Sequence, residues 1–477
     1  MSSICTSNVT SGFIDLATFD ELEKYCYGGP DATAYFVRET RKSTWFTQVP
    51  VCLSRASGTP AFDQEWSVSI SRAGDYLLHT WLRVTTPKIQ ARTKTEAVGG
   101  VSLRWTRNFM HNLIRECCIT FNDLVAARFD NYHLDFWSAF TVPAGKQNGY
   151  NMMIGNFGGM TSPVKSFTAG DLVVNDTIQP YTLNLPLPFF FCRDSGVALP
   201  TAALPYNDMR LNFNFRNWDD LLIAAPEPEV VGPIHPQWRR AELADLLSGG
   251  SPPQIGATQV WANYAIVSND ERKRMACAPR DILIEQVQTA PRQTFSPSSV
   301  SNPQYDIRFS HAIKVLFFSC RNITVHSEWS NYTTHPPAQP VGATGIDFTP
   351  PNSSDPIIST SLIYENTQRL ATMGSDYFSL VNPYYFAPNI PEVTGYHMYS
   401  YSLDFICLDP MGSTNYGKLT NVSIAPIASD AAKRASLGFS APTGPVDMPA
   451  QKFEFITTAI NNNIIRVSGG ALGFPVL

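Results

Sequence analysis

The sequence predicts an all-β protein built from two tandem β-sandwiches. Charged residues make up only 16% of the chain while aromatic residues reach 12%, and 36 prolines outnumber 29 glycines. Many aromatic residues and closely spaced prolines favour strands and turns over long helices. The chain has 477 residues and a mass of 52.8 kDa. Because an all-β sandwich often needs 200 residues or more, this length fits two domains better than three.

The second indication is a strand–loop–strand plan that occurs twice. Apolar residues alternate with Thr, Asn or Pro over 181–187, and again over 209–215 after a loop that contains Pro and Gly. The same layout returns at 399–405 and, after another loop, at 418–424. A two-residue period is typical of a sheet with one buried face. The repeated plan suggests a duplicated β unit, although the identity between the copies is weak.

Other strands and a few short helices are expected in order along the first unit, residues 31–225. The expected strands are 45–53, 66–70, 75–84, 119–126 and 218–223, and the expected helices are 108–116, 132–141 and 150–154. Connections that carry small helices are typical of a sandwich with elaborated loops.

Residues 1–30 form an N-terminal arm with one short helix. Thr18 followed by Glu21 matches a capping box, and a Gly-Gly-Pro sequence at 28–30 ends the helix. Phe19, Leu22, Tyr25 and Cys26 would share one face. Docking of this face on the protein itself is the favoured interpretation, and a helix lying on a membrane is the alternative.

A Pro-rich linker is expected at 226–256, with a helix at 237–247 inside it. The second unit then covers 257–477 and consists of strands to the end of the chain. Residues 333–356 contain six prolines and few large apolar residues, which predicts an exposed loop.

Composition excludes several classes of partner. The net charge is −5 and no run of Lys or Arg is present, so direct binding to nucleic acid is not expected.

No stretch approaches the roughly 18 apolar residues of a membrane-spanning helix, and no signal peptide is recognised. The nine cysteines are scattered without C-x-x-C spacing, which predicts free thiols in a reducing compartment.

The sequence predicts no catalytic, cofactor-binding or metal-binding residue, and hence no enzyme. No motif for a nucleophile, a phosphate-binding loop or a zinc site is present, and the eight histidines have no ligand spacing. Asp219 with Asp220, and Asp376 with Glu392, are the acid pairs that a glycosidase or lyase could use. Solvated acids in turns are the simpler interpretation of both pairs.

Two aromatic strips leave a carbohydrate-binding sandwich as an alternative function. The strips are Tyr396, Tyr399 and Tyr401, and Tyr384, Tyr385 and Phe386. Such side chains could stack on sugars, as in a lectin or a receptor-binding protein. Packing in the core or between subunits is the preferred interpretation.

Many stretches along the whole chain resemble the major capsid proteins of iridescent viruses. The similar stretches are NVTSGFIDL (8–16), YFVRET (35–40), GDYLLHTWLRV (74–84), HNLI (111–114), FNDLVA (121–126), LDFW (134–137), ALPTAALPYNDMRLNF (198–213), DDLLI (219–223), LIYENT (362–367), DPMGSTNYGKLTNVS (409–423), AQKFE (450–454) and GFPVL (473–477). They occur in the order of the family, while 226–255 and the loop at 333–356 diverge from it.

The resemblance implies a double jelly roll, in which two eight-stranded jelly-roll sandwiches follow one another in one chain. It also implies a homotrimer that serves as a capsomer, contacts neighbouring capsomers and minor capsid or cement proteins, and tiles an icosahedral shell. The shell would surround an inner viral membrane, which the N-terminal arm could touch. The expected location is the virion, after assembly in the host cytoplasm.

Overall fold

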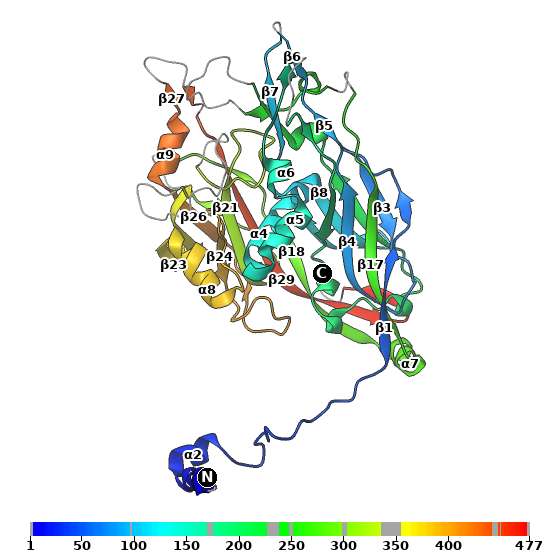
Figure 1. Ribbon diagram of the computed structural model, residues 1–477, viewed down its shortest axis with the longest axis vertical. Helices are drawn as coiled ribbons and strands as arrows, with labels where there is room; N and C mark the ends of the chain where they lie inside the picture. Colours follow the sequence, from blue (N-terminus) through cyan, green and yellow to red (C-terminus); the bar gives the residue numbers. More distant parts are fainter. Residues whose placement is uncertain are drawn as a thin grey trace. The chain divides into compact units, whose positions relative to one another are not determined.

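The computed structural model of the chain describes residues 3–95, 98–168, 175–226, 238–247, 251–297, 303–334, 354–440, 447–448 and 450–474 (Figure 1). The chain forms two compact units, Met1–Trp45 and Phe46–Leu477. Most of the predicted loop at 333–356 lies outside the described residues. Its two ends meet, because the amide of Thr334 donates to the carbonyl oxygen of Ser354 at 2.8 Å.

The N-terminal unit contains two helices, α1 (Ser3–Ala17) and α2 (Glu21–Cys26). The capping box lies two residues later than predicted, with Asp20 as the N-cap and Glu23 as its partner. Thr18 instead donates its hydroxyl to the carbonyl oxygen of Asp15 at 2.6 Å, which closes the end of α1. The sequence therefore predicted α2 with a shifted start and missed α1.

Two sheets face each other in the first sandwich. One has the order β1-β17-β4-β13 and the other β2-β3-β14-β8-β9. The strands are β1 (Phe46–Cys52), β2 (Arg55–Ser57), β3 (Glu65–Ser69), β4 (Tyr76–Thr85), β8 (Ile114–Phe121), β9 (Leu124–Asp130), β13 (Thr182–Pro186), β14 (Met209–Phe215) and β17 (Thr258–Val267). In β14 every second side chain is buried, as the alternation predicted.

Two details of this sandwich differ from the sequence prediction. The strand predicted at 119–126 is instead the end of β8 and the start of β9, joined by a hairpin turn at Asn122 and Asp123, which both have positive φ. Residues 258–267 were placed at the start of the second unit. They form β17 instead, which pairs with β1 and β4 in the centre of a first-sandwich sheet.

A small sheet of order β10-β7-β15-β16 extends the first sandwich. It contains β7 (Val101–Trp105), β10 (Val164–Lys165), β15 (Leu222–Pro226) and β16 (Arg239–Arg240). The helix predicted at 237–247 is wrong in the described part, because β16 pairs with β15 and only the 3₁₀ turn η5 (Leu243–Asp245) follows. Ala241 and Leu246 are buried, so the described residues of the predicted linker pack into the first sandwich.

The second sandwich also consists of two sheets. The larger has the order β18-β29-β21-β24, and the smaller β20-β26-β22-β23. Their strands are β18 (Arg280–Thr289), β20 (Tyr305–Asp306), β21 (Ala312–Asn322), β22 (Ile357–Tyr364), β23 (Thr367–Gly374), β24 (His397–Ser400), β26 (Val422–Ala428) and β29 (Phe453–Ser468). The short strands β19 (Gln293–Phe295), β25 (Thr414–Asn415) and β30 (Ala471–Gly473) pair at the margins of the larger sheet.

The strands predicted at 399–405 and 418–424 are only partly correct. β24 ends at Ser400, because the Ser400 hydroxyl donates to the carbonyl oxygen of Ser402 and the chain then turns. The 3₁₀ turn η7 (Tyr416–Lys418) delays the second strand until Val422. In both copies of the repeated plan, the strand before the loop and the strand after it lie in different sheets.

Helices occupy the connections, as predicted. The helices are α3 (Phe109–Leu113), α4 (Asn131–Thr141), α5 (Ala144–Ile154), α6 (Gly158–Thr161), α7 (Asn269–Cys277), the π-helical turn η6 (Tyr377–Val381), α8 (Asn382–Phe386) and α9 (Asp430–Leu437). The remaining short elements are β5 (Ile89–Gln90), β6 (Thr93–Lys94), β11 (Phe167–Thr168), β12 (Thr177–Ile178), β27 (Phe439–Ser440), β28 (Asp447–Met448), η1 (Phe190–Cys192), η2 (Ser195–Val197), η3 (Thr201–Ala203) and η4 (Trp218–Asp220). Figure 1 shows α4 and α5 in the centre, between the sheets of the two halves.

The two sandwiches share a core. Strand β21 is buried on both faces, with Leu316 and Phe318 in the core of the second sandwich and Val315 and Phe317 in the core that continues into the first. The ring of Phe317 stacks on Phe140 of α4, with the ring centroids 5.5 Å apart. The residues from 46 onward therefore form one compact unit instead of two separable domains.

Candidate functional sites: the junction and an exposed tyrosine patch

Charged and aromatic side chains gather where the two sandwiches meet. We call this region the junction, and it consists of Asp135, Glu285, Trp329 and the residues that contact them. Trp329 follows β21 and enters this region. Its indole nitrogen donates to the carbonyl oxygen of Asp220 at 2.8 Å. The guanidinium carbons of Arg216 and Arg321 lie 3.7 and 3.6 Å from the centroid of the Trp329 ring. Cation–π contacts are strongest when they are desolvated. Trp329 therefore links Arg216 of the first sandwich to Arg321 of the second.

Asp135 of α4 is the centre of a buried hydrogen-bond network. One carboxylate oxygen accepts from Asn108 at 3.1 Å and from Nδ1 of His111 at 2.7 Å. The other accepts from the hydroxyls of Ser330 at 2.7 Å and Tyr332 at 2.8 Å. Because Ser330 and Tyr332 belong to the second half, this carboxylate joins the halves.

His111 extends this network through both ring nitrogens. Nδ1 donates to the Asp135 carboxylate, which only accepts hydrogen bonds, and Nε2 lies 2.7 Å from the Tyr150 hydroxyl. Burial raises the pKa of Tyr150 far above its ordinary value. His111 and Asp135 are fully buried, so they act as a structural connection.

Glu285 of β18 forms a second buried connection. Its carboxylate accepts from Arg193 of the first half and from Lys314 of β21. Arg193 also donates to the carbonyl oxygen of Ile406 at 2.9 Å, and Lys314 donates to that of Cys407 at 2.7 Å. Burial lowers the pKa of Arg193, and the charge of Glu285 opposes this effect. The cations thus have their hydrogen bonds satisfied, as buried charges require.

The structure shows where the two acid pairs lie. Asp219 and Asp220 both form ion pairs with the guanidinium of Arg240, at 2.7 and 3.0 Å. Asp376 immediately precedes η6. Glu392 lines a cavity together with Asn389 and Val393, and Asp376 is not among the residues that line this cavity. The structure therefore does not bring Asp376 and Glu392 together in one pocket.

The first aromatic strip belongs to the core. Tyr396 packs between Phe136 and Tyr332. The hydroxyl of Tyr401 bonds to those of Tyr364 and Tyr416, the latter at 2.6 Å. The sugar-stacking surface that the sequence offered as an alternative is therefore unavailable on these residues.

In the second strip Phe386 packs against the core, whereas the two tyrosines remain exposed. Tyr384 and Tyr385 of α8 are each 71% accessible, and their ring centroids are 5.2 Å apart. Val381 at the end of η6 is also exposed. We call Val381, Tyr384 and Tyr385 the tyrosine patch. Exposed pairs of large aromatic side chains are typical of protein–protein contacts, where tyrosine is enriched.

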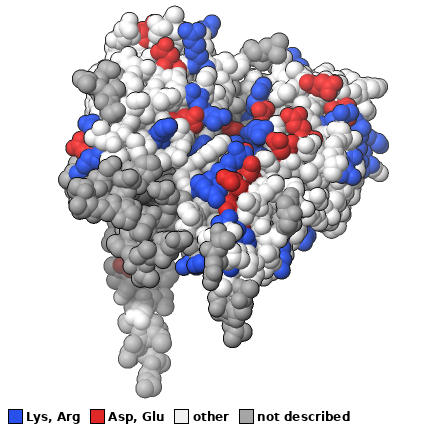
Figure 2. All heavy atoms as spheres, turned by 90° about the horizontal axis from the view of Figure 1, so that it is seen from above, with Lys and Arg blue, Asp and Glu red and all other residues white. Residues whose placement is uncertain are grey.

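Three further observations concern metal sites, cysteines and surface charge in the described part of the chain. No group of His, Cys, Asp or Glu there has the arrangement of a metal site. The described cysteines carry free thiols, and no described helix is long and apolar enough to cross a membrane. Figure 2 shows Lys and Arg intermingled with Asp and Glu on one face of the molecule, which differs from the single-sign surface of a nucleic-acid binder.

The sequence did not identify the junction. Its only signal is a charged residue within an apolar strand, as with Lys314 in the run 312–320 and Glu285 in 281–287. A buried charge needs a partner, but the partner lies far away along the chain. The positions of Asp135, Trp329 and the tyrosine patch follow from the tertiary fold alone.

Comparisons with known proteins cover almost the whole chain. Residues 271–473 match the family described as large eukaryotic DNA virus major capsid protein, and residues 34–267 match the family described as major capsid protein N-terminus. The major capsid protein of Costelytra zealandica iridescent virus is 63% identical over 475 residues, which cover 100% of both chains. That of Lymphocystis disease virus 1 (isolate Darai) is 49% identical over 479 residues, again 100% of both.

Solved structures show the same fold at low identity. The protein of the PBCV-1 virus capsid superimposes with a TM-score of 0.69 at 19% identity, covering 93% of this chain and 100% of that one. The Faustovirus major capsid protein gives a TM-score of 0.66 at 12% identity, covering 92% and 93%. The likeness extends over both sandwiches and the junction between them.

Proposed function

The chain belongs to the family of major capsid proteins of large eukaryotic DNA viruses, and from this premise we propose that three copies assemble into a capsomer with a nearly hexagonal outline. Its fold is the double jelly roll, and its place is the capsid shell of the virion. The observation that carries the proposal is the shared core, which holds two similar sandwiches in one rigid block. Three such blocks around a threefold axis present six comparable sandwiches, as a flat hexagonal tiling requires.

Threefold symmetry makes the contact between copies heterologous, so the first jelly roll of one chain should meet the second jelly roll of its neighbour. The tyrosine patch supports this arrangement. It lies on the second jelly roll, and Figure 1 shows α8 at the opposite side of the second unit from β17. Permanent contacts of this kind typically bury more than about 2,000 Å² and are apolar.

We place the boundary between the jelly rolls after Val267. The pairing of β17 with β1 and β4, and the two family matches that meet near residue 270, support this boundary over the one expected at 256. Minor capsid or cement proteins and neighbouring capsomers remain proposed partners. The inner viral membrane as a partner of the arm, and assembly in the host cytoplasm, also remain proposals.

We also infer that the chain performs no catalysis and binds no nucleic acid directly. The pairing of Asp219 and Asp220 with Arg240 supports the first inference. The net charge of −5 supports the second.

The tyrosine patch provides the test of the trimer. Replacing both residues, Tyr384→Asp and Tyr385→Asp, places charges in an apolar contact and should convert the trimer to monomer in light scattering. Tyr206→Asp is the matched control, because Tyr206 is 76% accessible on the first jelly roll. Unchanged mass in the double variant would exclude the tyrosine patch from the contact, whereas equal losses in both variants would indicate a general effect of charge.

A further inference from the structure

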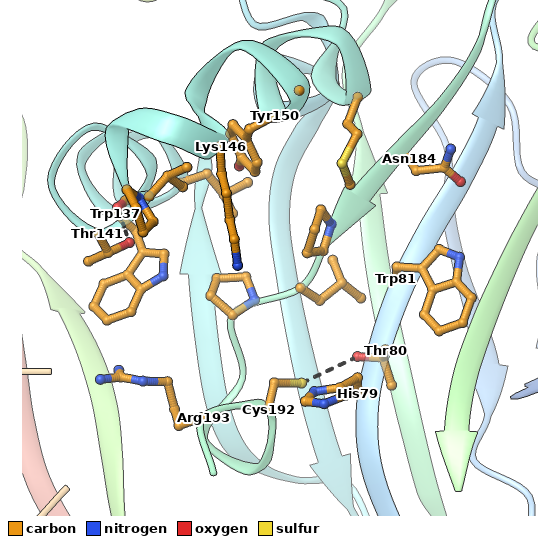
Figure 3. A pocket seen from close by; sticks show the side chains of 18 of the residues that line it. His79, Thr80, Trp81, Trp137, Thr141, Lys146, Tyr150, Asn184, Cys192 and Arg193 are labelled. Carbon is orange, nitrogen blue, oxygen red and sulfur yellow. Dashed lines mark hydrogen bonds between the residues drawn. The ribbon is translucent and has the colours of Figure 1, made fainter. Parts of the chain in front are cut away.

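A large apolar pocket opens on the first jelly roll, beside the helices α4 and α5 (Figure 3). Its volume is about 930 Å³, near the upper end of the range of roughly 300–1,000 Å³ for sites that enclose organic ligands. Trp137 of α4 and Trp81 of β4 stand on opposite sides of it in Figure 3. Leu187 and Met153 also line the pocket. We call this cavity the α5 pocket.

The centre of the α5 pocket carries one positive charge. Figure 3 shows the side chain of Lys146 projecting from α5 into the pocket, between Trp137 and Trp81. The Lys146 ammonium makes no hydrogen bond or ion pair with any residue that the structure describes. No Asp or Glu occurs among the residues that line the pocket.

Two other polar groups of the pocket are engaged or weak. Arg193 is held by Glu285 and by the carbonyl oxygen of Ile406, and its guanidinium carbon lies 4.3 Å from the centroid of the Trp137 ring. The thiol of Cys192 contacts the Thr80 hydroxyl at 3.9 Å, and burial raises the pKa of Cys192 to about 11, so the thiol stays protonated. Of Lys146 and Arg193, Lys146 is thus the cation without a described partner.

We propose that the α5 pocket binds a single-chain apolar carboxylate, such as a free fatty acid, with the carboxylate on Lys146 and the chain between the two tryptophans. Burying a hydrocarbon chain contributes about 0.8 kcal/mol per CH₂ group, so the apolar walls supply most of the affinity. The unpaired ammonium of the exposed Lys146 supplies the preference for an anion through a charge-assisted hydrogen bond. This inference is independent of the proposed trimer contact.

Calorimetric titration of the purified full-length protein, in its native assembly, with laurate below its micellar concentration tests the proposal. We expect saturable binding of one laurate per chain, and weaker binding of acids with shorter chains. Lys146→Gln should lower the affinity about tenfold or more, the contribution of one charge-assisted hydrogen bond. Lys165→Gln is the control, since Lys165 is exposed on β10 and does not line the pocket.

A variant with the opposite charge at Lys146 distinguishes the loss of the binding charge from misfolding. Lys146→Glu should lose laurate and gain affinity for dodecyltrimethylammonium, which has the same chain with a cationic head. Laurate binding that is equal in the wild type and in Lys146→Gln would overturn the proposal. The absence of saturable laurate binding by the native assembly would also overturn it, because a neighbouring copy would then occupy the pocket.

Discussion

At the scale of single residues, a few buried polar groups determine how the two jelly rolls are joined. Asp135 accepts four hydrogen bonds, and two of the donors come from the other half of the chain. Glu285 holds one cation from each half. Buried groups of this kind are directional, so they fix the relative position of the two sandwiches more strictly than apolar contact alone.

Asp135→Ala should destabilise the protein by about 3–5 kcal/mol, because it leaves buried donors without an acceptor. The urea midpoint of unfolding measures this loss. Asp409→Ala is the control, since Asp409 lies exposed in the loop after β24. Similar midpoints for the two variants would show that the Asp135 network contributes little.

The contacts of Asp75 should make the packing of α7 sensitive to acid. Burial raises the pKa of Asp75, but the hydrogen bonds from Arg272 and from the amide of Val267 outweigh burial and hold the pKa below the ordinary 3.8. A carboxylate with a lowered pKa contributes its stabilisation fully above pH 3.8 and loses it as the pH falls through the lowered pKa. Acidification below this lowered pKa should therefore release α7, which carries Arg272.

Hydrogen exchange over residues 269–277, corrected for intrinsic rates, measures this release. The wild type should be protected at pH 5 and lose protection at a pH below 3.8, once the lowered pKa of Asp75 is passed. Asp75→Asn should already lack the protection at pH 5 and should change little with pH. Protection of α7 that is independent of pH in the wild type would contradict the role of Asp75.

The sequence reveals residues of this kind only in part. Lys314 stands out because it interrupts an apolar strand, yet the sequence gave no indication that Glu285 and Arg193 are nearby. Asp135 occurs in a short helix, where an acid is ordinarily solvated. The relevant contacts join residues about 29 to 197 positions apart, and a period within one strand carries no information about them.

At the scale of elements, β21 is the strand on which the two halves depend. A strand buried on both faces reads as a continuous apolar run instead of an alternation. Residues 312–320 show such a run, and the strand predicted there is confirmed. The helix predicted at 132–141 is confirmed as α4, and residues 150–154 form the last part of the longer helix α5. The helix predicted at 108–116 is only partly correct, because α3 ends at Leu113 and residues 114–116 begin β8.

Elements near turns were predicted less well, for identifiable reasons. The helix at 237–247 failed because pairing with β15 overrides the helical propensity of Arg239 and Arg240. The strand at 399–405 was too long, because hydroxyl and carboxylate side chains at Ser402 and Asp404 bond to nearby backbone and favour turns. Pairing of β17 with the first sheet could not be predicted, since the order of strands is not encoded in periodicity.

Phe317→Ala should cost about 3–5 kcal/mol, because it removes a buried ring between β21 and α4 and leaves a cavity. The urea midpoint should fall accordingly. Phe46→Ala provides the control, since Phe46 is half-exposed at the start of β1. A loss in Phe317→Ala no larger than in the control would show that the packing of β21 on α4 does not hold the halves together.

At the scale of the whole molecule, the fold explains how one chain can serve a hexagonal lattice. Two jelly rolls with a common core behave as one rigid block with two similar ends. The family resemblance in the sequence predicted this architecture, and both the structure and the comparisons confirm it. Composition and periodicity alone indicated two β units but neither the jelly-roll order of strands nor the shared core.

The assembly state of the purified protein tests the central claim most directly. Light scattering should give a mass of three times 52.8 kDa that does not change with salt, because the proposed contacts are apolar. Negative-stain images of the same sample should show particles with a hexagonal outline. A stable monomer across micromolar concentrations, or a dimer with twofold symmetry, would contradict the account.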